Sequence, residues 1–123
     1  MEISALAEAL ADRGPGYLLT ASADGRVKAV TVEPELRDGV LRCPPSGGSA
    51  RNLAANPAAT LLFPPPVERG HTLLVDGTAV ADEDGIAFTP ASAVLHRPAD
   101  HADGPAPGLG SADGCGHDCA PVT

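Results

Sequence analysis

Residues 44–57 read PPSGGSARNLAANP, and this stretch places a turn and a short helix in the middle of the chain. The two prolines end a preceding strand because proline has no backbone N–H for a strand ladder, and the Ser-Gly-Gly that follows releases the backbone. Alanine, leucine and asparagine over residues 49–56 favour a helix of about two turns. An Asn-Pro pair ends this helix, and a strand pattern begins directly after it.

Short strand patterns lie on both sides of this helix. They cover residues 16–22, 26–33 and 40–43 before it and residues 59–63, 71–82, 86–88 and 93–98 after it. Asp76 and Gly77 indicate a bulge, and Pro90 indicates a break between the last two strands. Apolar side chains at helical spacing also predict an amphipathic helix within residues 2–13. The sequence therefore predicts about seven strands and two short helices.

Many short strands joined by tight turns predict a mainly β fold, either a sandwich or a barrel. A barrel would remove exposed strand edges from so small a protein. The chain of 123 residues has single-domain length, and we place the folded domain at residues 1–99. Its aromatic side chains are Tyr17, Phe63 and Phe88, with no tryptophan. We therefore expect a thin aliphatic core that burial against a partner subunit would strengthen.

Sixteen acidic residues against eight basic ones give a formal net charge of −8. This charge repels phosphate backbones, so no nucleic-acid binding is predicted. The chain has no apolar run of the roughly 20 residues that a membrane span needs, and we expect a soluble cytoplasmic protein with reduced thiols. Residues 100–123 are rich in glycine, proline and aspartate and hold no lysine or arginine, which predicts a flexible tail.

The turn before the central helix is a candidate anion site. The first N–H groups of a helix have no partner inside the helix, and the helix dipole makes that end positive, so the stretch suits a phosphate. Arg51 would add a bidentate contact, and Ser46 or Ser49 would add a hydroxyl or cap the helix. The alternative is a capped surface helix whose arginine is solvated.

A second candidate site lies in the tail, where Cys115, His117 and Cys119 stand at alternate positions. Two thiolates and an imidazole suit a soft or borderline metal such as zinc or copper, and His101 or a second chain would complete the ligand set. The alternative is a free tail without a metal, because the spacing is not that of a zinc finger.

The remaining histidines are His71 and His96, the latter beside Arg97. A catalytic role would need a nucleophile or a carboxylate close to them, so ordinary positions at the edge of a sheet explain them better. The chain has neither a Gly-x-Ser-x-Gly elbow nor a helical His-Glu-x-x-His, so hydrolase chemistry is not predicted.

The order of these elements and their amino-acid sequences resemble those of the pyridoxamine 5'-phosphate oxidase-like family of FMN-binding split β-barrels. The resemblance covers residues 1–98 and rests on GYLLTASADGRVKAVTVEPELRDGVLRC (16–43), SARNLAANPAATLLF (49–63) and LLVDGTAVADEDGIAFTPASAVLHRP (73–98). Arg-Asn-Leu at 51–53, followed by Asn-Pro, is similar to the family's segment after the third strand. Asp-Gly-Thr-Ala at 76–79 is similar to its glycine and small-residue step in a central strand.

The resemblance implies a Greek-key split barrel that works as a homodimer, with a flavin in each of two grooves between the subunits. The positions that match the family's contacts are Ser46, Ser49, Arg51 and Asn52 for the phosphate, and the backbone of Val30, Thr31 and Val32 for the isoalloxazine. Many members carry a cation where this chain has Ser49, so a second cation would come from Arg26, Lys28 or Arg42.

The function that this resemblance implies is an FMN-binding oxidoreductase acting on a small molecule. Pyridoxamine phosphate oxidation is not predicted, because the chain lacks the length and the basic C-terminal residues of the true oxidase. The alternatives are a relative that binds F420, a cofactor-free or metal- or heme-binding split barrel that uses its Cys-Gly-His-Asp-Cys tail, and a dimeric scaffold.

Overall fold

The structure is a computed structural model, and it describes residues 1–98. The helical segments in this range are the 3-10 turn η1 (Ile3–Ala5), helix α1 (Leu6–Leu10) and helix α2 (Gly47–Ala55). The strands are β1 (Gly16–Ala21), β2 (Val27–Val32), β3 (Glu35–Arg37), β4 (Val40–Cys43), β5 (Ala58–Phe63), β6 (Thr72–Asp82) and β7 (Gly85–His96). No helix among the described residues is long and apolar enough to cross a membrane.

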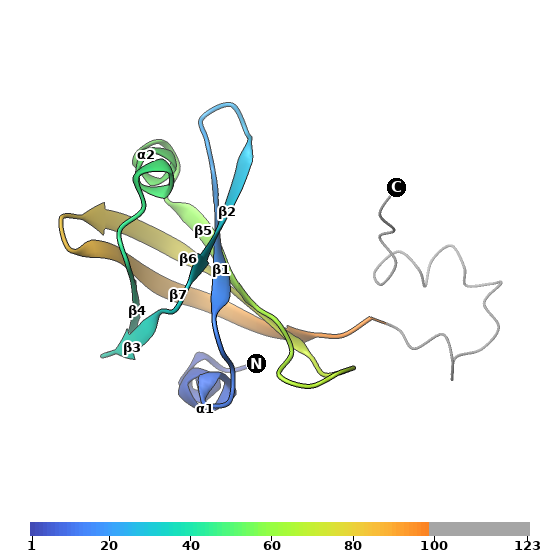
Figure 1. The fold of residues 1–123 in the computed structure, drawn as a ribbon. Helices are drawn as coiled ribbons and strands as arrows, with labels where there is room; N and C mark the ends of the chain where they lie inside the picture. Colours follow the sequence, from blue (N-terminus) through green and yellow to red (C-terminus); the bar gives the residue numbers. More distant parts are fainter. Residues whose placement is uncertain (99–123) are drawn as a thin grey trace, which may run out of the picture.

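The strands of the described region form one antiparallel sheet in the order β2-β1-β5-β6-β7-β4-β3. The two edge strands, β2 and β3, are consecutive in the chain, and only Glu33 and Pro34 separate them. The sheet therefore curls until its edges approach each other at this connection, which is the form of a split barrel (Figure 1). Strands β5, β6 and β7 form a meander, and β4 lies beside β7, so these four strands form a Greek key.

The central helix and the bulge are confirmed, but the predicted break in the last strand is wrong. Strand β7 runs through Pro90, because the register of β6 and β7 shifts between Asp76 and Gly77 and leaves Ala91 as an extra residue. The proline lies where the ladder to β6 is interrupted, and also beyond the end of the ladder between β7 and β4, which covers residues 86–88 of β7. Its missing N–H is tolerated there.

Two other elements differ from the predictions in detail. Strand β3 has no predicted counterpart, because it is only three residues long. The helix predicted within residues 2–13 begins as the 3-10 turn η1 and continues as the short helix α1. The number of strands nevertheless matches, because β3 offsets the two predicted strands that merge into β7.

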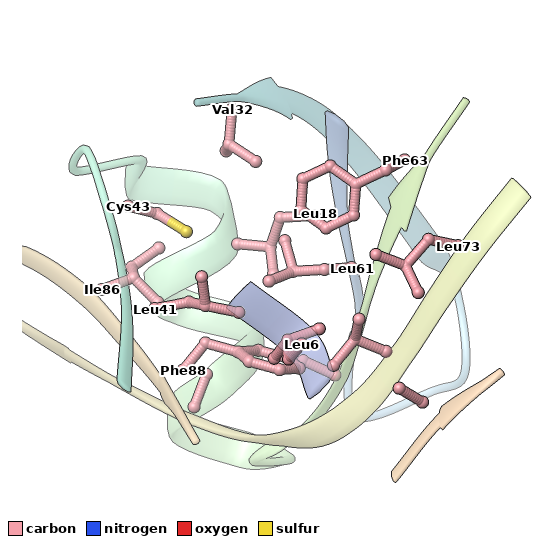
Figure 2. Close-up of a cluster of buried hydrophobic side chains, with 14 of the residues drawn as sticks. Leu6, Leu18, Val32, Leu41, Cys43, Leu61, Phe63, Leu73, Ile86 and Phe88 are labelled. Carbon is pink, nitrogen blue, oxygen red and sulfur yellow. The ribbon is translucent and has the colours of Figure 1, made fainter. Parts of the chain in front are cut away.

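The hydrophobic core fills the space inside the curled sheet (Figure 2). Its largest fully buried side chains are Phe63, Phe88, Leu18, Leu41, Leu61, Leu73, Ile86 and Val75. Leucines and valines outnumber the aromatic side chains, as the composition predicts. Each α-helix adds one buried leucine, Leu6 from α1 and Leu53 from α2. Ala9 and Leu10 of α1 also pack against the core while half-buried, and polar contacts help to hold both helices in position.

Arg13 provides such contacts for α1. Its Nε donates to the carbonyl of Ala9 (3.0 Å), and its Nη1 donates to those of Phe63 (3.3 Å), Pro64 (3.2 Å) and His71 (2.8 Å). The guanidinium therefore joins the end of α1 to both ends of the connection between β5 and β6.

Helix α2 is fastened to the sheet through Asn52. The Nδ2 atom of Asn52 donates to the hydroxyl of Thr20 on β1 (3.0 Å), and Thr20 is only 2% exposed. Beyond the helix, the N–H of Ala79 on β6 donates to the carbonyl of Pro57 (2.9 Å). These bonds fix which side of α2 faces the sheet.

One outward surface of the sheet is apolar. The register places Tyr17, Leu62, Leu74 and Val94 side by side across β1, β5, β6 and β7. We call the surface formed by the side chains of Tyr17, Leu19, Val27, Leu62, Leu74 and Val94 the outer face. Tyr17, Val27 and Val94 are 40%, 68% and 49% exposed. Contiguous exposed apolar side chains of this kind mark interaction surfaces.

Replacing Gly77 by alanine is expected to destabilise the fold, because a Cβ there would lie 2.1 Å from the carbonyl oxygen of Thr89. We expect a loss of about 1–3 kcal/mol in the free energy of unfolding, measured by urea denaturation followed by circular dichroism. Gly14→Ala is the matched control, because a Cβ at Gly14 has no atom within 4 Å. Equal unfolding midpoints for the two variants would contradict this account.

Replacing Asn52 by alanine is expected to lower the free energy of unfolding by about 1–3 kcal/mol, because it leaves the buried Thr20 hydroxyl without its Asn52 partner. Arg51→Ala, one residue away and exposed, is expected to change it by no more than about 0.5 kcal/mol. The double variant Asn52→Ala with Thr20→Val should recover part of the loss, because both polar partners are then removed. Strictly additive effects would show that the two side chains do not act as a pair.

Candidate functional site

The start of α2 has the geometry of a capped helix. Ser46 is the N-cap residue with an extended backbone, and its Oγ accepts a hydrogen bond from the N–H of Ser49 (3.5 Å). The N–H of Ala50 donates to the carbonyl of Ser46 (2.8 Å). Gly47 and Gly48 lie in the first turn of α2. The backbone N–H groups of a first turn have no acceptor within the helix. This end of α2 therefore combines donors with a partial positive charge.

Two cations converge on these glycines. A Cβ on Gly47 would lie 3.7 Å from Nη1 of Arg51, and a Cβ on Gly48 would lie 2.5 Å from Cε and 3.1 Å from Nζ of Lys28. Lys28 belongs to β2, far from α2 in the sequence. Within residues 1–98, neither cation has a hydrogen bond or an ion pair. Both charges therefore remain available to a bound anion.

The structure distinguishes the three candidates for a second cation. Lys28 reaches the start of α2, whereas Nε of Arg26 lies 3.9 Å from Oδ2 of Asp24. Arg42 donates to both carboxylate oxygens of Asp82, each at 3.3 Å. This hydrogen bond from Arg42 is the main reason that the pKa of Asp82 lies below its ordinary value. Arg42 is thus engaged elsewhere, and Lys28 is the cation that joins Arg51.

Ser49 and Asn52, which the resemblance also matches to the phosphate, have side chains that face inward. Ser49 is fully buried, and its Oγ accepts a hydrogen bond from the hydroxyl of Ser46 (3.1 Å). Asn52 is directed to Thr20 on β1. A cation at position 49 would be buried beside the core, which explains physically why a small hydroxyl residue stands there. The solvent-facing residues of the site are Ser46, Gly47, Gly48 and Arg51, with Lys28 opposite.

Strand β2 offers backbone groups along an open edge. Among residues 1–98 it pairs with β1 alone, so the N–H and C=O groups on its other side have no strand partner in that range. The side chain of Val32 is buried, that of Val30 is half-buried, and that of Thr31 is exposed. A ring lying along this edge would meet the backbone of Val30 to Val32 rather than their side chains. Lys28 on the same strand connects this edge to the start of α2.

No nucleophile or metal centre is visible in the described part of the chain. Cys43 is buried, and its burial raises the pKa of the thiol to about 11, so the reactive thiolate is scarce at neutral pH. Residues 1–98 contain no group of three or more metal-ligating side chains. His71 and His96 lie at the ends of β6 and β7. Cys115, His117 and Cys119 lie outside the described residues, so the metal site in the tail remains a prediction.

A groove also lies on the outer face. Its volume is about 450 Å³, and it crosses β1, β5 and β6. The sequence indicates the bulge beside it but not the groove, because the groove depends on which strands become neighbours. Its lining residues are Leu19, Thr20, Ala21, Val27, Asn56, Ala58, Ala59, Thr60, Leu62, Leu74, Asp76 and Gly77.

Comparison with known sequences identifies two relatives, both described as uncharacterized proteins. No model of a protein family matches the sequence. The uncharacterized proteins Mb0449c of Mycobacterium bovis and MT0457 of Mycobacterium tuberculosis are each 37% identical to this chain over 136 residues. Each alignment covers 97% of this chain and 92% of the relative. Only about four residues of this chain lie outside the alignments, which therefore extend into the segment that holds Cys115.

Comparison with solved structures concerns the fold. HupZ of Group A Streptococcus matches with a TM-score of 0.64 and 13% identity, over 79% of this chain and 95% of that chain. A protein solved as an F420 reductase matches with a TM-score of 0.58 and 18% identity, over 71% and 94%. Both are split barrels of the kind that the sequence resembles. The chain therefore belongs to the same family as the two mycobacterial proteins, and its fold is the split β-barrel of the pyridoxamine 5'-phosphate oxidase-like proteins.

Proposed function

We propose that this protein binds FMN, with the phosphate at the start of α2, and works as a flavin-dependent oxidoreductase on a small organic molecule. The observation that carries the proposal is the convergence of Lys28 and Arg51 on Gly47 and Gly48. The fold supports it, because the chain shares the split barrel with a solved F420 reductase.

Charge favours a phosphate at this place. The chain has twice as many acidic as basic residues, yet two cations without a carboxylate partner in the described region lie together at a helix start. A phosphate monoester carries nearly two negative charges at neutral pH, which the two cations would balance. Backbone N–H groups of the first turn would supply hydrogen bonds, and the Ser46 hydroxyl could add one only by giving up its bond to Ser49 Oγ.

The remaining parts of the proposed site are backbone. The open edge of β2 at Val30, Thr31 and Val32 would orient the isoalloxazine, which supplies hydride chemistry when FMN is bound. No side chain is needed as a nucleophile, and the protonated thiol of Cys43 fits that view. F420 is the alternative cofactor, and the solved F420 reductase of the same fold is the observation that favours it.

We also propose that the protein is a homodimer joined through the outer face. Tyr17, Val27 and Val94 are exposed there although they are apolar. A second copy would bury them and would compensate for a core with few aromatic side chains. The edge of β2 borders the outer face, so a site along this edge would lie next to the second subunit.

The flavin proposal is tested by titrating FMN into the purified full-length protein and following flavin fluorescence. Arg51→Ala and Lys28→Ala are each expected to weaken binding by about 1.5–3 kcal/mol, because each removes a charged contact to the phosphate. Arg37→Ala is the control, because Arg37 pairs with Glu35 on β3. Equal affinity of all variants would place the phosphate elsewhere, and binding of F420 but not FMN would favour the alternative cofactor.

The homodimer is tested by analytical ultracentrifugation of the wild type and of Val94→Arg. A charge at this half-exposed position on β7 should dissociate the dimer without disturbing the core. Val67→Arg is the control, because Val67 is 65% exposed in the connection between β5 and β6. A monomeric wild type at high protein concentration would refute the proposed dimer.

A further inference from the structure

A pocket lies at the end of the curled sheet that α1 covers, opposite the end that holds α2 (Figure 1). We call it the α1 pocket. Its volume is about 310 Å³, at the lower limit of the roughly 300–1,000 Å³ typical of small-molecule sites. Its large apolar side chains are Leu10 of α1, Leu36 of β3 and Phe63 of β5. None of its lining residues belongs to the outer face, so a homodimer joined through that face does not use them.

Arg13 lines the α1 pocket with a charge that no carboxylate balances. The side chain is half-buried, and the hydrogen bonds of its Nε and Nη1 go to neutral backbone carbonyls. Among residues 1–98 the guanidinium forms no ion pair, and its Nη2 atom forms no hydrogen bond. An arginine side chain has five N–H donors, so Nη2 can still donate to a carboxylate. The pocket therefore offers a cation whose hydrogen-bonding capacity is only partly used.

Glu33 lines the same pocket from the connection between β2 and β3. Its side chain is exposed, and it forms no ion pair with Arg13 or with another cation of the described range. The pocket thus presents a positive and a negative group that do not neutralise each other. A ligand with only a carboxylate would be repelled by Glu33, and a ligand with only an amine would be repelled by Arg13. A ligand that carries both charges avoids both repulsions.

We propose that the α1 pocket binds a free α-amino acid with an apolar side chain. Its carboxylate would accept a hydrogen bond from Nη2 of Arg13, and its ammonium would pair with Glu33. Its side chain would lie against Leu10, Leu36 and Phe63. This ligand class matches the two opposite charges and the apolar lining together.

The α1 pocket is separate from the phosphate site. Glu33 follows the last residue of β2, and Lys28 lies five residues earlier, which is roughly 16 Å along an extended strand. The proposal therefore goes beyond FMN binding and does not rest on it. Flavin fluorescence reads the phosphate site and amide chemical shifts read the α1 pocket, so either site can fail alone.

The test titrates L-phenylalanine into the full-length protein without flavin and follows the chemical shifts of the backbone amides. We expect saturable binding with a dissociation constant on the order of 1 mM, as befits a ligand of so few atoms. Two analogues keep the aromatic body: 3-phenylpropionate lacks the ammonium, and 2-phenylethylamine lacks the carboxylate. Each should bind about fivefold more weakly, because each loses one charged contact and meets one repulsion.

A variant tests the ammonium contact and leaves the structural hydrogen bonds of Arg13 intact. Glu33→Gln should weaken phenylalanine about threefold, because an exposed ion pair contributes little. The same variant should bind 3-phenylpropionate at least as well as the wild type, because the repulsion is removed. Glu8→Gln is the matched control, because Glu8 belongs to α1 but does not line the pocket, and it should bind phenylalanine like the wild type.

Several results would overturn the proposal. They are no saturable binding of phenylalanine, equal binding of phenylalanine and either analogue, equal binding of phenylalanine by wild type and Glu33→Gln, and shifts that map away from Leu10, Leu36 and Phe63. If Glu33→Gln does not fold, the comparison of the three ligands on the wild type still decides the question.

Discussion

The close approach of β6 and β7 at Gly77 is the constraint on which the rest of the structure depends. The backbone of β7 at Thr89 comes so near that only a residue without a side chain fits. The shift of register at this point bends the two longest strands and lets one sheet curl until its edge strands β2 and β3 are adjacent. Without that curl, Lys28 on the edge strand would not reach the start of α2.

The local features of the fold could be predicted from the sequence, and the long-range ones could not. Prolines, glycines and the Asn-Pro pair mark the ends of α2, and the Asp-Gly pair marks the bulge, because each acts through its own backbone. The break predicted at Pro90 is wrong, because proline disrupts a strand only where its missing N–H would bond to a neighbouring strand. The sequence does not reveal which strand lies beside Pro90. Strand β3 exists only because β4 pairs with it, and three residues carry no pattern.

The candidate site divides in the same way. Ser46 and Arg51 follow from the helix start alone, and the structure places both at the solvent-facing end. The inward direction of Ser49 and Asn52 depends on the rotation of α2, which Leu53 and Thr20 determine through packing and hydrogen bonding. The sequence offers Lys28, Arg26 and Arg42 equally as a second cation, and only the curl of the sheet distinguishes Lys28 from the two arginines.

The glycine pair at the start of α2 has a consequence beyond chain flexibility. The backbone φ angle of Gly48 is not positive, so the backbone conformation at this position does not by itself require glycine. What it leaves open is the volume into which the aliphatic stem of Lys28 extends. A methyl group there would displace the end of a flexible side chain rather than the backbone. A side chain at position 48 would therefore change where the Lys28 ammonium lies and leave the backbone of the fold in place.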